Sequence, residues 1–231
     1  MRKLIVILIF TLIGCHTLLA FDQQLGGELR VGNSWDNDTY LQESVSWKGL
    51  LHNWSVGGIA GIRQHIGYGC SFYGLQAKGG YVHIFEDGHQ LEGVLSYNYS
   101  PYRLSRLNEH VWALYASYKY PHISVSLGYQ IRHLHDATTS HSEFSNCLYN
   151  IEAYVWDRSK VPYNLYFQVH NFEPLRIERT TNVMFSIRAQ YRQREPTLDY
   201  NLRFTFEPAG VGNIMFNHYE WRTAVCIVWH Y

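Results

Sequence analysis

The stretch Tyr219-Glu-Trp-Arg-Thr-Ala-Val-Cys-Ile-Val-Trp-His-Tyr231 decides how the rest of the sequence is interpreted. Apart from Thr223, every second residue from Tyr219 onward is apolar or aromatic, and the residues between them are mixed and polar. A period of two is the pattern of a β-strand whose faces meet different surroundings. The stretch stops on an aromatic residue, whereas a free strand end in a soluble protein usually tapers into polar residues. It therefore predicts a strand with one face in an apolar medium.

The same alternation recurs along residues 21–231 in segments separated by turn-forming or polar residues. Clear examples are Ile123–Arg132, Tyr163–His170 and Val183–Arg192. Counted together, the segments predict about 12 strands (10–12), each roughly 9–11 residues long, which is the length that a tilted strand needs to cross hydrocarbon. Proline is scarce, as long paired strands require.

The connections between these segments alternate in length. Short ones are expected at 52–53, 87–88, 120–121, 157–161 and 195–197, and longer ones at 34–39, 67–72, 100–108, 133–143, 172–181 and 207–218. Short turns at one end and long loops at the other are typical of barrels that cross a membrane. Hydrocarbon offers no hydrogen-bond partner, so a sheet that crosses it must close on itself. We therefore predict an all-β fold, a single up-and-down antiparallel barrel. A secreted soluble β-sandwich is the alternative, but its outward faces would be polar.

The beginning of the chain has the pattern of a secretory signal peptide. Met1–Lys3 is basic and Leu4–Ile13 is apolar but too short to span a membrane as a helix. Cleavage after Ala20 would leave residues 21–231 as the barrel, although Leu18 fits poorly where a small residue is preferred. Leu12–Cys15 also resembles a lipobox, which would make Cys15 a lipidated residue. Either interpretation predicts export.

Composition excludes several classes of function. The chain has 19 basic and 19 acidic residues, so it offers no electrostatic case for nucleic acid. We expect no metal site, since no CxxC or His-rich ligand spacing appears, and no cofactor. After export an odd set of cysteines remains, Cys70, Cys147 and Cys226, which excludes a complete disulfide framework. A bond between Cys70 and Cys147 stays open.

The predicted signal, the alternating segments and the terminal Trp229-His230-Tyr231 resemble the Gram-negative outer-membrane β-barrels. This resemblance implies insertion in the bacterial outer membrane, with outer-membrane lipids as surroundings. In that class the barrel assembly machinery reads a terminal aromatic residue with apolar residues at alternate positions. Val225, Ile227, Trp229 and Tyr231 match this pattern, with tyrosine where phenylalanine is more common.

The inward faces of the predicted strands carry most of the candidate functional residues. Arg30, Arg188 and Arg203 come at similar depths from strands that closure makes neighbours or near neighbours, and Arg192 and Arg222 share their wall. Acids of the middle strands, Glu92, Glu109 and Glu152, are expected roughly opposite. A basic wall facing an acidic one would select ions by sign. Alternatively, these charges interlock as ion pairs and stop flow.

We predict a passive channel for small polar or ionic solutes, with its constriction at Arg30, Arg188, Arg203, Arg222, Glu92 and Glu152. The alternatives are a structural or adhesive barrel and a lipid-modifying enzyme. For an enzyme, His133, His135 and His141 lie near Ser140, Ser142, Ser145 and Asn146, but their spacing matches no hydrolase motif. For surface recognition, the predicted loop 100–108 carries Tyr102, Arg103 and Arg106.

Overall fold

The computed structural model describes residues 22–33, 39–65, 69–102, 107–136, 141–156, 161–172, 183–194, 197–208 and 219–231. The predicted signal peptide, with Cys15 and its cleavage site, lies outside the described residues, as do Ser140, Arg103 and Arg106. In the described part of the chain, no helix is long and apolar enough to cross a membrane.

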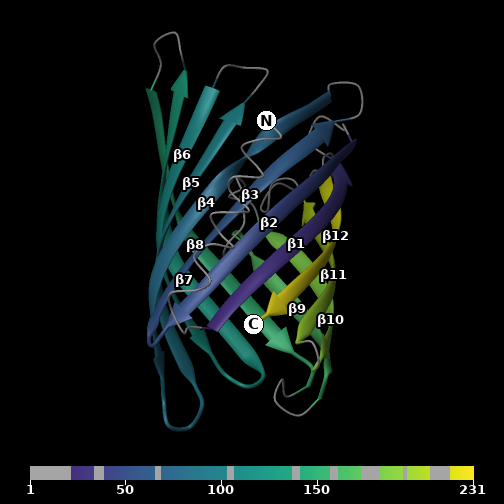
Figure 1. Cartoon of the computed structure of the whole chain (residues 1–231). Helices are drawn as coiled ribbons and strands as arrows, with labels where there is room; N and C mark the ends of the chain where they lie inside the picture. The colour runs from purple at the N-terminus through teal and green to yellow at the C-terminus, as the bar shows by residue number, and fades with distance from the viewer. Residues whose placement is uncertain are drawn as a thin grey trace.

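Within these ranges, twelve antiparallel strands form one closed sheet in which each strand pairs with its sequence neighbours and the last pairs with the first. This confirms the predicted up-and-down barrel (Figure 1). The strands are β1 Asp22–Asn33, β2 Thr39–Leu51, β3 Trp54–His65, β4 Gly69–Ile84, β5 Gln90–Tyr102, β6 Leu107–Lys119, β7 Ile123–Asp136, β8 His141–Tyr154, β9 Tyr163–His170, β10 Met184–Gln193, β11 Leu198–Pro208 and β12 Tyr219–His230.

The two faces of the sheet differ as the alternation predicts. Outward residues are large and apolar, with Leu114 64% and Leu127 63% exposed, whereas the inward neighbours of Leu127 on β7 include the buried Ser124 and Ser126. A closed sheet pairs its backbone amides internally and leaves no edge to be satisfied by solvent. An outward apolar belt of this kind is stable only against an apolar medium, which is the arrangement of a membrane-spanning barrel.

One end of the barrel carries the short connections at 52–53, 85–89, 120–122, 155–162 and 194–197, and we call it the turn end. At this end His52 has a φ of 54°, and a positive φ at this position is typical of the favoured two-residue hairpin turns. The opposite end is called the loop end. Outward aromatic residues gather near the turn end, in pairs such as Trp54 with Tyr81, whose ring centroids are 5.2 Å apart, and Trp156 with Tyr163, at 5.4 Å. Such rings suit the boundary between lipid and water.

Strand lengths vary more than the sequence predicts, from 8 residues in β9 to 16 in β4. Three of the expected long loops are more than half strand, because β4 begins at Gly69, β5 and β6 reach Tyr102 and Leu107, and β7 and β8 reach Asp136 and His141. The extended ends of β5 and β6 pair with each other, and so do those of β7 and β8. The hydrogen-bonding groups of their backbone therefore remain paired beyond the apolar belt. The wall that contains β4, β5 and β6 therefore rises higher than the wall of β9 to β11 (Figure 1).

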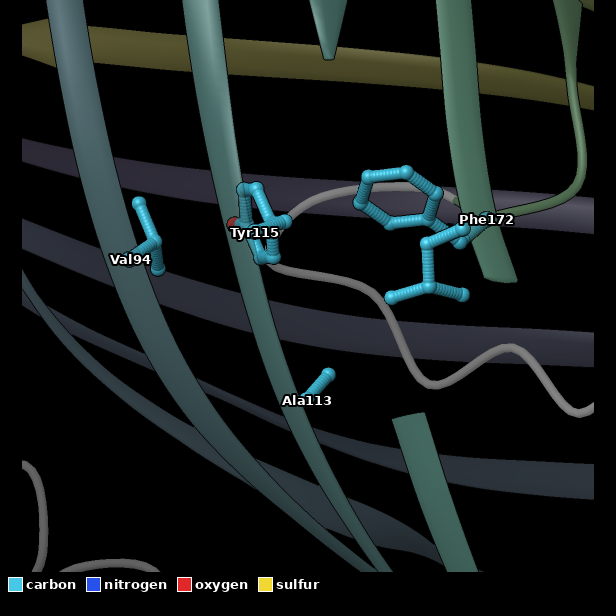
Figure 2. Packing of buried hydrophobic residues seen from close by; sticks show 5 residues of the cluster. Val94, Ala113, Tyr115 and Phe172 are labelled. Carbon is cyan, nitrogen blue, oxygen red and sulfur yellow. The ribbon is translucent and has the colours of Figure 1, made fainter. Parts of the chain in front are cut away.

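An apolar cluster lies inside the barrel, formed by Val94, Ala113, Tyr115, Leu148 and Phe172. Figure 2 shows the ring of Tyr115 between Val94 and Phe172. The ring centroids of Tyr115 and Phe172 are 5.0 Å apart. The inward Gly128 of β7 makes room for Tyr115, since a Cβ there would lie 2.3 Å from the Cβ of Tyr115.

The side chain of Asn171 allows the chain to depart from the β-sheet, so that Phe172 packs in this cluster. The β8–β9 ladder has five residue pairs and ends at Asn150 and His170. Beyond it, the side chain of Asn171 accepts from the backbone N–H of Tyr149 at 2.8 Å and donates to the carbonyl of Cys147 at 2.8 Å. The side-chain amide thus replaces one step of the backbone ladder, and the chain turns inward at Phe172.

The cysteines form no disulfide in the described structure, so the open pairing of Cys70 with Cys147 does not occur there. Both side chains are exposed, and Cys147 is on the outward face of β8, while Cys226 is half-buried on the inward face of β12.

Candidate functional site: the charged lumen

The lumen is lined by the inward residues of all twelve strands, and charged side chains are frequent among them. Basic groups outnumber acids ten to seven among the described inward side chains. The basic residues are Arg30, Lys48, Arg63, Lys78, Lys119, Arg132, Arg188, Arg192, Arg203 and Arg222, and the acids are Asp22, Glu28, Glu92, Glu109, Glu152, Asp199 and Glu207.

Four arginines lie in one oblique row along the sheet. Arg188 of β10 pairs with Arg203 of β11, which pairs with Ala224 of β12. Ala224 pairs with Arg30 of β1, and the row continues through Gln42 of β2 to Arg63 of β3.

We call Arg63, Arg30, Arg203 and Arg188 the arginine row. Neighbouring strands are about 4.8 Å apart, and barrel strands are tilted, so a pairing row runs obliquely and not around a ring. Arg63 lies near the loop end of β3, whereas Arg188 lies midway along β10. The row therefore leads from the loop end of the lumen toward its middle.

The sequence predicts the neighbourhood of Arg30, Arg188 and Arg203, and the structure brings these three into the row. Arg63 was not predicted as a site residue, although its position beside the outward stripe of β3 placed it on the inward face. Its guanidinium lies between the rings of Tyr40 and Tyr73, 3.9 Å from each centroid, and donates to Gln42 at 2.7 Å. Stacking of this kind fixes the group without removing its charge.

Two carboxylates hold Arg30 and Arg188 of the arginine row in place. Glu28 accepts from Arg30 of the same strand at 3.0 Å. Glu152 of β8 accepts from Arg188 at 2.9 Å, and the Arg188 guanidinium stacks on Tyr166 of the intervening strand β9 at 3.9 Å. The expectation that Glu152 faces the arginines from the opposite wall is wrong, because β8 and β10 are separated by one strand and a long arginine side chain reaches across it.

Arg222 and Glu109 are held in further ion pairs near the loop end. Arg222 lies 3.8 Å from Glu207 and donates to the sulfur of Met184 at 2.7 Å. Glu109 accepts from the Nε of Arg132 on the neighbouring strand at 2.9 Å. Some lumen charges therefore form ion pairs with one another. Basic groups nevertheless outnumber the acids on the inward face.

A second group lies at the turn end of β10 to β12, around Asp199. Its carboxylate accepts from Arg192 at 2.6 Å, from Gln190 at 3.0 Å and contacts His230 at 3.0 Å. Gln190 in turn accepts from the hydroxyl of Tyr166. This network links the last strand to β10 and belongs to the framework that holds the wall together.

A third group surrounds Glu92 at the turn end of β2 to β6, and sequence reasoning predicted only its acid. Glu92 accepts from Ser55 at 3.2 Å, and its two oxygens lie 3.8 Å from Lys78 and 3.4 Å from Lys119. Lys48 of β2 lies in one pairing row with Gly57 of β3 and Lys78 of β4. The alternation placed Lys48 and Lys78 on inward faces, but nothing local in the sequence indicates that lysines from three strands meet.

Apart from Ser140, which lies outside the described residues, the histidine and serine residues considered for catalysis lie on β7 and β8. In that register His133 pairs with Glu143, His135 with His141, and Ser145 with Ile131. Ser145 is thus two positions along the strand from the residue opposite His133. Among the described residues, no group of three His, Cys, Asp or Glu side chains could hold a metal ion.

Comparison with known proteins supports the architecture. No family model and no curated protein matches the sequence. Among solved structures, the NanC porin matches with a TM-score of 0.56 at 11% identity, over 88% of this chain and 98% of that one. An outer membrane channel from Pseudomonas putida F1 matches with a TM-score of 0.55 at 7% identity, over 91% of this chain and 95% of that one.

The chain has the fold of the outer-membrane β-barrels. At these identities the likeness shows the fold alone, so the function of this outer-membrane-type barrel has to be argued from its own lumen. The relevant features are the arginine row, the lysines around Glu92 and the apolar cluster at Tyr115.

Proposed function

We propose that the protein is a passive channel of the bacterial outer membrane that passes small polar solutes and prefers anions. The arginine row is the observation that carries this proposal. Arg63, Arg30, Arg203 and Arg188 provide successive cationic positions along one oblique path. Charged side chains that line a pore are the usual basis of ion selectivity.

The sign of the preference follows from the excess of basic groups in the lumen. Glu28 and Glu152 offset part of the charge of the row, but they also hold Arg30 and Arg188 at fixed positions in the lumen. Because a narrow lumen has low-dielectric walls, an unbalanced charge there acts on a passing ion more strongly than it would in bulk water.

Planar bilayer recordings of the purified, folded protein test this function. We expect steady conductance steps whose reversal potential in a KCl gradient indicates a preference for chloride. The variants Arg203→Glu and Arg188→Glu should shift the reversal potential toward that of potassium. Arg194→Glu is the matched control, since Arg194 is exposed at the turn end beyond the lumen and should leave the potential unchanged. Folded protein that produces no steps would remove the channel.

The location is supported by the outward face of the last strand. Val225, Ile227, Trp229 and Tyr231 are all outward, with exposed fractions from 37% to 51%. Such a stripe is available both to lipid and to the barrel assembly machinery, which we propose as a partner during insertion. Trp229→Ser should reduce the amount of folded barrel recovered from outer membranes, while refolding of the same variant in detergent stays efficient. An unchanged yield in cells would exclude this role.

A further inference from the structure

The lysines around Glu92 form a cluster with a net positive charge. The chain has five lysines, and Lys48, Lys78 and Lys119 meet here on β2, β4 and β6. Within the described residues, Glu92 is the acid of this cluster, and three lysines against one carboxylate leave two positive charges. One oxygen of Glu92 accepts a hydrogen bond from Ser55 and forms an ion pair with Lys78, and the other forms an ion pair with Lys119.

Two of these lysines lie on either side of a glycine. Lys48 and Lys78 both pair with Gly57 of β3, one from each side, and Gly57 has no side chain to fill the inward position between them. The side chain of Lys119 is 35% exposed and that of Lys78 is buried against Glu92. Lys48 is half-buried, so Lys48 and Lys119 are the two lysines of the cluster that are not fully buried.

We propose that Lys48, Lys78 and Lys119 form a binding subsite for one small dianionic oxyanion at the turn end of the lumen. Lys48 and Lys119 would contact the anion, and Glu92 with Ser55 would position the lysines beneath it. Two net positive charges attract a dianion about twice as strongly as a monoanion. Ammonium groups act as point charges without the planar fork of arginine, so the subsite suits compact phosphate as well as carboxylate.

This inference deepens the proposed function by assigning a preferred solute class to a separate place in the lumen, away from the arginine row. Inorganic phosphate is the probe, titrated into detergent-solubilised folded protein at low ionic strength and followed by calorimetry. Succinate provides a dicarboxylate of equal charge, and acetate provides a monoanion. We expect saturable phosphate binding, with acetate binding much more weakly. Succinate shows whether shape matters in addition to charge.

Two variants that change the lumen charge equally separate a site from a general field. Lys119→Gln should weaken phosphate binding by about tenfold, the effect of losing one charge-assisted hydrogen bond. Arg192→Gln removes one cation near the turn end of another wall and should leave the affinity within about twofold of the wild type. Equal weakening by both variants, or phosphate binding no tighter than acetate, would overturn the proposal.

Separate controls distinguish a loss of binding from a loss of folding or of conductance. Lys119→Arg keeps the charge and should retain most of the binding, and heat-dependent migration on gels shows whether each variant is folded. If the wild-type protein conducts anions but binds no phosphate, the subsite is excluded and the channel stands. If phosphate binds in a lysine-dependent way but bilayers show no conductance, the subsite stands and the channel proposal falls.

Discussion

Gln23 and Tyr231 exchange both of their backbone hydrogen bonds, each with an N···O distance of 3.0 Å, and so join the first strand to the last. The Tyr231 hydroxyl also donates to the side chain of Gln23 at 3.3 Å. Tyr231 thus completes the seam at the turn end, while its ring lies 4.8 Å from that of Trp229 on the outward face.

Deletion of Tyr231 removes these two backbone bonds from the seam. We predict that the free energy of unfolding in detergent micelles falls by about 1–3 kcal/mol, since each bond contributes about 0.5–1.5 kcal/mol. Urea titration of refolded protein measures this change. Tyr231→Phe keeps the backbone bonds and should change the stability by less than the deletion does. Equal effects of the two variants would show that the hydroxyl, and not the seam, matters.

Gly128→Ala tests the close packing between β6 and β7. A Cβ at this position would lie 2.3 Å from the Cβ of Tyr115 and 2.4 Å from the carbonyl oxygen of Leu114, and backbone cannot give way cheaply. We predict a loss of about 1–3 kcal/mol in unfolding free energy, the usual effect of overpacking. Gly93→Ala is the matched control, because a Cβ at Gly93 meets nothing within 4 Å. Equal stabilities of the two variants would contradict the packing.

Leu127→Arg tests whether the outward face meets lipid. The side chain of Leu127 is 63% exposed, and arginine in the middle of a bilayer costs about 2–4 kcal/mol. We predict this loss for protein refolded in lipid vesicles, measured by denaturant titration. Glu86→Arg, at an exposed turn between β4 and β5, should cost much less. A Leu127→Arg variant as stable in vesicles as the wild type would place this face in water.

Glu152→Gln tests the role of the carboxylate that holds Arg188. Its removal adds one unbalanced positive charge to the lumen. We predict that the reversal potential in a KCl gradient moves further toward that of chloride. Glu86→Gln changes the net charge equally but lies outside the lumen and should have no such effect. A shift toward potassium would contradict the electrostatic account of selectivity.

The sequence predicts the barrel well because the period of two is a local signal. Successive residues of a strand point alternately inward and outward, so the side of each residue follows from its position in the strand. Arg30, Arg188 and Arg203 face the lumen, as this alternation predicts. Their alignment in one row could not be predicted, since it depends on the register between strands. The position of Glu152 relative to the arginines was predicted wrongly for the same reason. A linear sequence does not show that Arg188 reaches across β9 to Glu152 while its guanidinium stacks on Tyr166.

The lysine cluster was missed for a further reason. Lys48, Lys78 and Lys119 are widely separated in the sequence, and each looks like an isolated polar position of its strand. Their meeting depends on the depth of each residue within the tilted wall and on the glycine at position 57. Tertiary register, which no local pattern encodes, creates this candidate site.

The reversal potential of the unmodified protein across a KCl gradient in a planar bilayer tests the central claim most directly. A lumen that is enclosed by the barrel and lined by ten basic and seven acidic described side chains predicts steady current steps and a potential displaced toward chloride. Steps with a potential displaced toward potassium, or a folded and inserted barrel that carries no current, would contradict it.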